Sequence, residues 1–417
     1  MLYEKESDKF FLPASNMKLI TTAGALAILK PEFRYRTSIL TNGKMKGDTL
    51  IGDILLSTNG DPTLTSETLS LLARGLKLKG INHITGALLF NDTYFDTIPY
   101  GKGWMWDDLQ YGFSAPISAL SVNRNTCRIY VRPGRKIGDA PIVNIEPETG
   151  FILIRNKAIT GEKSNLSVQR VFENGKNIII VKGIYPLNAK TKIFIRSVEK
   201  PYLYTISLFA EKLKGNGIEI GKKIERGASP QFQDTLIKYP SEPLIKLLYD
   251  MDKESSNFTA EVLLKTIGAE KRGLPGTTEK GIQSIEKLMK EKGIIKEKFL
   301  QKDGSGLSRY NLISPHQITS LLFYLYRRFE YAPEFLTVLP TSGIDGTLQN
   351  RIITPSTQRR VRAKTGTMTG VSTLSGYCIT ERGKVLIFSI MMKDYIASPT
   401  YIRNIQDKIL KILIKNF

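Results

Sequence analysis

The stretch Phe11-Leu12-Pro13-Ala14-Ser15-Asn16-Met17-Lys18-Leu19-Ile20 carries a string of reactive side chains into a segment with helical spacing. Between Ser15 and Leu29 the apolar side chains recur on one face, at Leu19, Ile20, Ala23, Leu26 and Ala27. This periodicity predicts a buried helix, and a proline on each side sets its limits. Residues three apart share a helix face, so Lys18 is predicted to reach the hydroxyl of Ser15.

Two later strings complete a pattern, and they follow in a fixed order. Ser255-Ser256-Asn257 reads S-x-N, and Lys364-Thr365-Gly366 reads K-T-G. Together with S-x-x-K they resemble the motif set of serine enzymes that are acylated by penicillins or by D-alanyl-D-alanine peptides. Such an enzyme takes a lysine as its base, which matters because the chain contains only two histidines, His83 and His316.

Each residue type in this set has a chemical reason. A serine hydroxyl needs a base to take its proton, and the pKa of a partly desolvated lysine beside a second cation is lowered into that role. Lys18 is the predicted base for Ser15, and Lys364 is its predicted cationic neighbour. Ser255 would relay a proton toward the leaving amine, while Asn257 would hold Lys18 and a substrate amide.

The K-T-G string is predicted to bind the substrate. Thr365 together with Lys364 would bind a terminal carboxylate. Gly366 and Thr367 are assigned to the same binding strand, where small residues let the substrate approach the backbone. The tetrahedral oxyanion needs two N–H donors, and the backbone groups of Ser15 and Thr367 are the expected sources.

Further copies of the short motifs must be separated from these. Ser197-Val198-Glu199-Lys200 follows a strand-like segment, and Ser284-Ile285-Glu286-Lys287 lies in a lysine- and glutamate-rich helix that we expect to be solvated. Both are interpreted as structural. Ser121-Val122-Asn123 also matches S-x-N, but Ser255 is favoured because a short connection between two predicted helices there could present two side chains to a cleft.

The rest of the chain divides by its secondary-structure patterns. Residues 35–204 are expected to be rich in short strands, for example at 50–56, 86–90, 128–131 and 177–181. Later helical patterns lie at 244–249, 258–267, 281–292 and 315–328, and strand-like runs lie at 361–364, 372–379 and 385–391. The last predicted helix, 400–414, is basic and amphipathic. We expect it to close the domain that carries the motifs rather than to lie on an anionic membrane.

Composition limits the possible classes of protein. The chain has 417 residues, 41% of them hydrophobic, which suits two or three globular domains. Its formal charge of +21 would favour anionic envelope polymers, although a lysine-rich solvated surface explains it equally well. Nucleic acid is not expected, because no zinc-finger spacing, RNA-binding aromatic signature or long basic arm is present. Cys127 and Cys378 belong to no ligand cluster, so we expect buried free cysteines, no metal and no cofactor.

Beyond the three motifs, the chain resembles the D-alanyl-D-alanine carboxypeptidase/endopeptidase family of DacB type, the class C low-molecular-mass penicillin-binding proteins. The resemblance covers nearly the whole chain and includes the gap of 255 − 15 = 240 residues between the first two motifs. The other stretches that resemble the family are Gly60-Asp61-Pro62-Thr63-Leu64, Phe113-Ser114-Ala115-Pro116, Asp303-Gly304-Ser305-Gly306-Leu307-Ser308 and Ser342-Gly343-Ile344-Asp345-Gly346-Thr347-Leu348.

This resemblance implies a fold. It is an α/β (α+β) serine hydrolase domain of the penicillin-binding-protein transpeptidase-like and β-lactamase-like type, with an antiparallel sheet between helices, split by two β-rich insertion domains. We expect the catalytic domain at 1–36 and 237–417, the first inserted domain at 37–120 and 203–236, and a nested β-rich domain at 121–202.

The resemblance also implies a reaction. It is the removal of the terminal D-alanine from peptidoglycan stem peptides, or the cleavage of D-alanyl cross-links, through an acyl-enzyme on Ser15, with β-lactams as acylating inhibitors. In this family an acidic and an aromatic residue of the first inserted domain reach toward the diamino acid of the stem peptide. Asp108 and Phe113 are the matching candidates, although a satisfied loop carboxylate and a core ring would give the same sequence.

Two departures and two rival interpretations accompany the resemblance. Ser256 replaces an aspartate often seen in S-x-N, with little expected effect. Residues 1–7 contain no export signal, so we expect a truncated or late start and an exported, periplasmic or extracytoplasmic parent protein.

A β-lactamase would need a deacylating base, and no E-x-x-L-N string supplies one. A non-catalytic wall-binding protein is the third interpretation, and the intact motifs argue against it.

Overall fold

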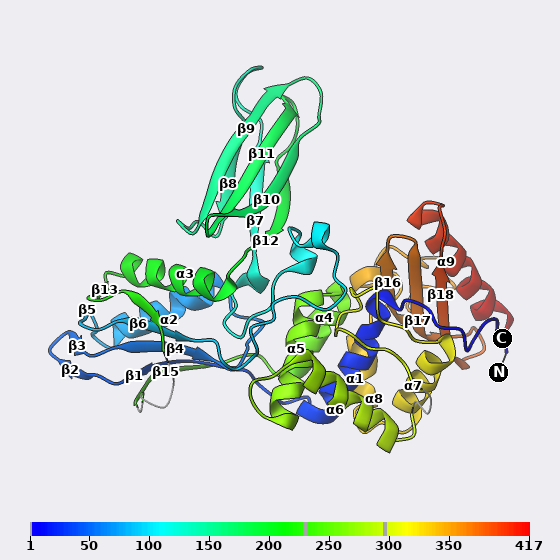
Figure 1. Ribbon diagram of the computed structural model, residues 1–417. Helices are drawn as coiled ribbons and strands as arrows, with labels where there is room; N and C mark the ends of the chain where they lie inside the picture. Colours follow the sequence, from blue (N-terminus) through cyan, green and yellow to red (C-terminus); the bar gives the residue numbers. More distant parts are fainter. Residues whose placement is uncertain (1, 228–231, 233, 295–297) are drawn as a thin grey trace. The chain divides into compact units, whose positions relative to one another are not determined.

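The chain divides into two units, which are described separately (Figure 1). The computed structural model describes residues 2–227, 232, 234–294 and 298–417. Unit 1 comprises Met1–Arg34, Gly101–Trp104 and Glu242–Phe417, and unit 2 comprises Tyr35–Tyr100 and Met105–Ser241. All three strings, S-x-x-K, S-x-N and K-T-G, lie in unit 1. The boundaries expected for the three domains stay predictions.

Unit 1 is built on a three-stranded antiparallel sheet in the order β16-β17-β18. The strands are β16 (Val361–Met368), β17 (Val371–Ile379) and β18 (Val385–Lys393), close to the predicted runs. The central strand β17 is buried on both faces, because side chains alternate along a strand and helices cover both sides. Its even-numbered residues Leu374 and Cys378 share a hydrophobic cluster with Leu410 of the last helix.

That last helix, α9 (Pro399–Asn416), packs against β17 and confirms the expectation that it closes the domain. On the opposite face of β17 the odd-numbered side chains meet the segment that bears the first motif. Thr373 donates from Oγ1 to the carbonyl of Pro13 at 2.9 Å, and Ser375 accepts from Asn16 Nδ2 at 2.6 Å. The sheet therefore anchors the start of the motif helix.

The motif helix consists of a short 3-10 turn, η1 (Ala14–Asn16), followed by α1 (Met17–Leu29). α1 is buried along most of its length, because it contacts four other helices. The remaining helices of unit 1 are α4 (Leu244–Glu254), α5 (Asn257–Arg272), α6 (Thr278–Glu291), α7 (Pro315–Arg327) and α8 (Ala332–Val338). Side-chain caps begin several of them, as a capping box of Ser314 and Gln317 does for α7.

The described residues of unit 2 include a five-stranded sheet, a four-stranded sheet and two α-helices. The first sheet has the order β14-β6-β4-β1-β15 and the second has the order β13-β5-β3-β2. The bounds are β1 (Arg36–Thr41), β2 (Lys44–Lys46), β3 (Thr49–Ile51), β4 (Ile54–Thr58), β5 (His83–Ile84), β6 (Leu88–Asn91), β13 (Glu219–Ile220), β14 (Ile224–Arg226) and β15 (Asp234–Pro240), with helices α2 (Ser66–Leu78) and α3 (Pro201–Gly215).

The other six strands of unit 2 form two three-stranded sheets, drawn in teal and green in Figure 1. Their orders are β10-β11-β9 and β12-β7-β8, with β9 and β11 parallel and the remaining pairs antiparallel. The bounds are β7 (Thr126–Arg132), β8 (Ile142–Glu146), β9 (Ile152–Gly161), β10 (Ser167–Glu173), β11 (Lys176–Pro186) and β12 (Lys192–Ser197).

The prediction of short strands for residues 35–204 is confirmed in kind but incomplete. The run at 50–56 is two strands, β3 and β4, interrupted at Gly52-Asp53. The helices α2, α3 and α8 were not predicted. For α2 the signal is in the sequence, because Thr65 caps a segment whose buried residues Leu69, Leu72, Ala73 and Leu76 have helical spacing. Among the described residues, no helix is both long and apolar enough to cross a membrane.

Candidate active site

Ser15 and Lys18 meet at the junction of η1 and α1. Lys18 is buried, and its Nζ donates to three acceptors: Ser15 Oγ at 2.9 Å, Asn257 Oδ1 at 2.6 Å and the carbonyl of Ser305 at 2.8 Å. The spacing of three residues places both motif side chains on one side of the first turn. The ammonium or amine of Lys18 is therefore fixed in position by groups from three separate segments.

The S-x-N string forms the connection between α4 and α5. Ser255 ends α4 in the left-handed conformation, with φ 60° and ψ 42°, which is uncommon for a residue other than glycine. Ser256 then caps α5 by accepting from the backbone N–H of Thr259. Because the connection turns so tightly, Ser255 contacts Lys364 and Asn257 contacts Lys18.

The K-T-G string lies on β16 beside η1. Lys364 is buried and its Nζ donates to Ser255 Oγ at 2.8 Å and to the carbonyl of Thr365 at 3.3 Å. A Cβ on Gly366 would lie 2.9 Å from the backbone nitrogen of Ser15, so only glycine allows this approach. Thr367 follows on the same strand and is exposed. The structure thus brings five predicted side chains together: Ser15, Lys18, Ser255, Asn257 and Lys364.

Burial governs the charge states of the two lysines. Desolvation, followed by the positive charge of Lys364, lowers the pKa of Lys18 to about 7. Desolvation also lowers the pKa of Lys364 to about 8, and the negative charge of Asp252 opposes this shift. Near neutral pH a substantial fraction of Lys18 is therefore deprotonated while Lys364 retains its proton.

Three buried carboxyl groups support the site and were not singled out from the sequence. Burial raises the pKa of Asp252 to about 6, and Thr22 Oγ1 donates to its Oδ2 at 2.7 Å. Glu261 accepts from the backbone N–H groups of Gly304 and Ser305, which fixes the turn whose carbonyl receives Lys18. Asp303 organises the same turn by accepting from Gly306 N, Ser308 N, Asn311 Nδ2 and Trp104 Nε1.

The sequence carries a signal for one of these three carboxyl groups, Asp303, but not for Asp252 or Glu261. Asp303 belongs to the stretch Asp303–Ser308 that resembles the family, and its four small residues, two of them glycine, are typical of a tight turn. Asp252 precedes Ser255 by three residues, and Glu261 follows Asn257 by four. Nothing in their local patterns separates them from solvated helix carboxylates, because their burial depends on contacts with segments remote in sequence.

The additional copies of the motifs have structural partners. Ser121 Oγ donates to the carbonyl of Ser118, and Ser197 Oγ accepts from Arg170. Ser284 corrects a prediction: it is buried rather than solvated, because it lies on the face of α6 that packs inward. Its hydroxyl donates to the carbonyl of Lys280 and accepts from Arg272 Nε.

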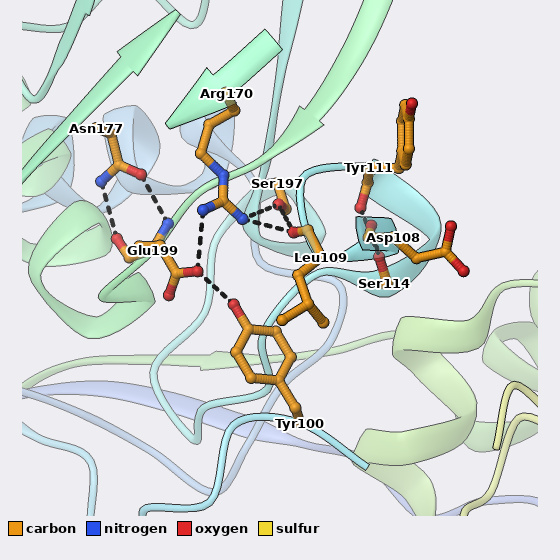
Figure 2. A network of polar contacts seen from close by, with 9 residues as sticks. All are labelled: Tyr100, Asp108, Leu109, Tyr111, Ser114, Arg170, Asn177, Ser197 and Glu199. Carbon is orange, nitrogen blue, oxygen red and sulfur yellow. Dashed lines mark hydrogen bonds and ion pairs between the residues drawn. The ribbon is translucent and has the colours of Figure 1, made fainter. Parts of the chain in front are cut away.

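Asp108 and Phe113 lie in unit 2, on the loop that carries η2 (Trp106–Asp108) and η3 (Gly112–Ser114). Phe113 is 47% exposed and stacks on Tyr111 with ring centroids 5.5 Å apart, so it is not a core ring. Figure 2 shows the carboxylate of Asp108 pointing away from the polar network that holds the loop. Within that network Ser114 Oγ donates to the carbonyls of Asp108 and Tyr111.

The network continues to the strands of unit 2 through Arg170 and Glu199. Arg170 donates to the carbonyl of Leu109 and to Ser197 Oγ, and it pairs with Glu199 at 3.0 Å (Figure 2). Tyr100 also donates to Glu199. The Arg170 side chain is only 7% exposed, so this pair is a buried anchor for the loop.

The chain has two cysteines, and neither belongs to a metal site among the described residues. Cys127 and Cys378 are both buried and free. Burial raises the pKa of the Cys378 thiol to about 11, so it stays protonated at neutral pH. Among the residues that the structure describes, no group of three His, Cys, Asp or Glu side chains is arranged to hold a metal ion.

A serine bound to a buried lysine, beside an antiparallel sheet that presents K-T-G, defines the class of serine hydrolases with the penicillin-binding-protein and β-lactamase-like fold. The chain belongs to the D-Ala-D-Ala carboxypeptidase 3 (S13) family, whose profile matches residues 1–415. It is a serine-type D-alanyl-D-alanine carboxypeptidase, as the resemblance to the DacB-type enzymes indicated.

Individual relatives support this membership. The D-alanyl-D-alanine carboxypeptidase of Actinomadura sp. (strain R39) is 32% identical over 407 residues, which cover 94% of this chain and 74% of that protein. The crystal structure of penicillin-binding protein 4 (DacB) from Haemophilus influenzae has a TM-score of 0.88 and 26% identity, over 99% of this chain and 93% of that chain. A structure of the same protein complexed with a β-lactam has a TM-score of 0.84 and 25% identity, with the same coverage.

Proposed function

We propose that this carboxypeptidase acts through an acyl-enzyme on Ser15, with neutral Lys18 as the base. The observation that carries the proposal is the fixed coordination of Lys18 Nζ. Two of its contacts, Asn257 Oδ1 and the Ser305 carbonyl, accept two N–H groups. The third contact of Nζ is with Ser15 Oγ, 2.9 Å away. In the neutral amine the lone pair takes this direction and can accept the hydroxyl proton.

In acylation, Ser15 Oγ attacks the carbonyl carbon between the last two D-alanines and its proton moves to Lys18. The oxyanion accepts from the backbone N–H groups of Ser15 and Thr367. A proton then passes through the Ser255 hydroxyl, which Lys364 contacts, to the nitrogen of the departing D-alanine. The C–N bond breaks, and the acyl group remains on Ser15. Water releases it by the reverse sequence, with Lys18 again as the base.

The substrate we propose is a peptidoglycan stem peptide. Its terminal carboxylate would bind Thr365 near the protonated Lys364, and its amide would bind Asn257. Asp108 and Phe113 would recognise the diamino acid. Cross-linked peptides with the same D-alanyl bond are a second substrate, so we propose endopeptidase activity as well. We also propose that the protein is exported and that its basic surface favours anionic envelope polymers.

Release of D-alanine is the direct test. Purified protein is incubated with a peptide ending in D-alanyl-D-alanine and with a cross-linked muropeptide dimer, and products are separated by chromatography. We expect release of D-alanine from the first and cleavage of the second, both lost in Ser15→Ala. Release of D-alanine by Ser15→Ala at the wild-type rate would refute the assignment of the nucleophile.

Acylation by β-lactams is a further part of the proposal, since penicillin-binding protein 4 of Haemophilus influenzae has been solved with one. A fluorescent penicillin separates the alternatives. A long-lived adduct supports the peptidase, rapid release supports a β-lactamase, and no adduct supports a non-catalytic wall-binding protein. We expect the long-lived adduct.

A further inference from the structure

The loop between α8 and β16 contains a hydroxyl that lies outside the three motifs. One part of this loop, Thr341 to Leu348, ends in a 3-10 turn, η6 (Gly346–Leu348). Thr347, in the middle of this turn, is exposed, and Thr365 Oγ1 donates to its Oγ1 at 2.8 Å. Thr365 is the residue expected to bind the terminal carboxylate of the substrate. The two hydroxyls therefore lie side by side in unit 1.

A partly buried ion pair holds the loop two residues before Thr347. Lys253 Nζ, on a side chain that is 7% exposed, donates to both carboxylate oxygens of Asp345 at 2.8 and 2.7 Å and to the carbonyl of Leu339 at 2.6 Å. Asp345 also accepts from the backbone N–H of Thr341 at 2.8 Å. The loop is thus tied to α4, two residues before Ser255.

Close packing of the backbone also ties the loop to α4. Gly346 has φ 56°, and a Cβ there would lie 2.7 Å from the carbonyl oxygen of Lys253. The turn can approach the end of α4 only because this residue is glycine. An ion pair, a carbonyl contact and a close-packed glycine thus hold the loop that carries Thr347 against the end of α4.

The chemistry of two adjacent hydroxyls suggests what this arrangement binds. Each hydroxyl has one hydrogen, and the contact between Thr365 and Thr347 uses one of the two. The other O–H is left to donate to an acceptor that approaches from solvent. A carboxylate accepts only and has about four lone-pair sites, so it is the natural ligand beside the ammonium of Lys364.

We propose that Thr347 is a further substrate-binding residue, which completes with Thr365 a two-hydroxyl clamp for the terminal carboxylate. This inference rests on the proposed function of the site. Lys253 and Asp345 are positioning residues that act through Thr347. The alternative that the experiment must exclude is that the Thr347 hydroxyl takes no part in recognising the carboxylate.

A pair of acyl donors isolates the carboxylate. Both are D-alanyl thioesters; the leaving group of one carries a free carboxylate, and in the other that carboxylate is a methyl ester. We measure kcat/KM for each and form their ratio, carboxylate over ester. Thr347→Val, which removes the hydroxyl and keeps the shape, should lower this ratio roughly tenfold, the size expected for a lost hydrogen bond to a charged group. Thr347→Ser should keep the ratio within about threefold of wild type.

The control is Thr337→Val, a matched substitution at an exposed threonine of α8, which should leave the ratio unchanged. Asp345→Asn should lower the ratio in the same direction as Thr347→Val, mainly through a higher KM. A ratio that stays at the wild-type value in Thr347→Val overturns the proposal. Failure of the proposed function would look different, since the wild-type protein would then turn over neither thioester.

Discussion

Among single residues, the two buried lysines contribute most to the chemistry, and they differ in role because they differ in surroundings. Lys18 contacts three oxygen acceptors, and the positive charge of Lys364 lowers its pKa. Lys364 contacts Ser255, and the negative charge of Asp252 raises its pKa. Desolvation lowers the pKa of both, but to different values, about 7 for Lys18 and about 8 for Lys364. One can then be a base at a pH where the other remains a cation.

This difference predicts a narrow, bell-shaped pH profile. Below about pH 7 Lys18 gains a proton and loses its role as base, and above about pH 8 Lys364 loses the charge that binds carboxylate. The second-order rate constant for acylation by a penicillin should therefore fall on both sides of pH 7 to 8. Stopped-flow measurement of adduct formation gives this profile, which reports on the free enzyme. An acid limb centred near pH 4 would instead point to a carboxylate base.

Asp252 sets the position of that profile. Its negative charge raises the pKa of both lysines, so Asp252→Asn should lower both and shift the whole bell toward acid pH. Asp250→Asn is the matched control, because it makes the same charge change on the exposed face of the same helix, where Asp250 pairs with Lys246. Equal pH profiles for Asp252→Asn and wild type would show that Asp252 does not raise the pKa values of Lys18 and Lys364.

At the scale of secondary-structure elements, the site depends on how closely β16 approaches η1. The clearest measure is Gly366, where a Cβ would lie 2.2 Å from Thr373 Oγ1 and 2.9 Å from Ser15 N. The S-x-N connection depends in the same way on the left-handed conformation of Ser255 between α4 and α5. The side chains of β16 and of the connection between α4 and α5 therefore reach the site only if these elements pack as closely as they do here.

Gly366→Ala should accordingly force β16 away from η1. We expect a loss of about 1–3 kcal/mol in the free energy of unfolding, the usual range for overpacking, together with a large loss of acylation rate. Gly215→Ala at the end of α3 is the control, because a Cβ there meets nothing within 4 Å. Denaturant titration and penicillin labelling check both. If Gly366→Ala matched wild type in both assays, the close approach would not be required.

The loop with Asp108 depends on a second element, the strand β10 that carries Arg170. Arg170→Met leaves the largely buried carboxylate of Glu199 with the Tyr100 hydroxyl but without its cationic partner, and breaking a buried pair typically costs about 3–5 kcal/mol. We expect a lower melting temperature and a higher KM for stem peptides with a diamino acid. Arg155→Met is the matched control, since the Arg155–Glu173 pair joins the two outer strands of the same sheet, β9 and β10, but both side chains are about half exposed. A drop in melting temperature as small as that of Arg155→Met would mean that Arg170 does not anchor the loop.

Across the whole molecule, the sequence predicted the reactive side chains better than their surroundings. The contact between Ser15 and Lys18 was predicted because motif spacing reports local geometry, here one turn of helix. The contacts of Asp252 and Glu261, and the contact of Thr347 with Thr365, were not predicted because they join segments far apart in the sequence. Ser284 was expected in solvent for the same reason, since its charged neighbours in sequence are not its neighbours in space.

The secondary structure follows the same rule. Long periodic segments such as α5 and β17 were predicted near their observed positions, because burial of one or both faces leaves a clear pattern. The helix α2 was not predicted because it lies within a region of strand patterns, and α8 was not predicted because it is short. Chain length and motif separation nevertheless indicated a catalytic domain interrupted by inserted material.

Peptide mapping of the penicillin adduct tests the central claim most directly. The protein is incubated with a penicillin at pH 7.5, quenched, digested and analysed by mass spectrometry, and Lys18→Met is treated in parallel. The account predicts one adduct, on the peptide containing Ser15, with a lifetime long enough to be isolated, and a large loss of its rate of formation in Lys18→Met. An adduct on any other residue, or an unchanged rate in Lys18→Met, would contradict it.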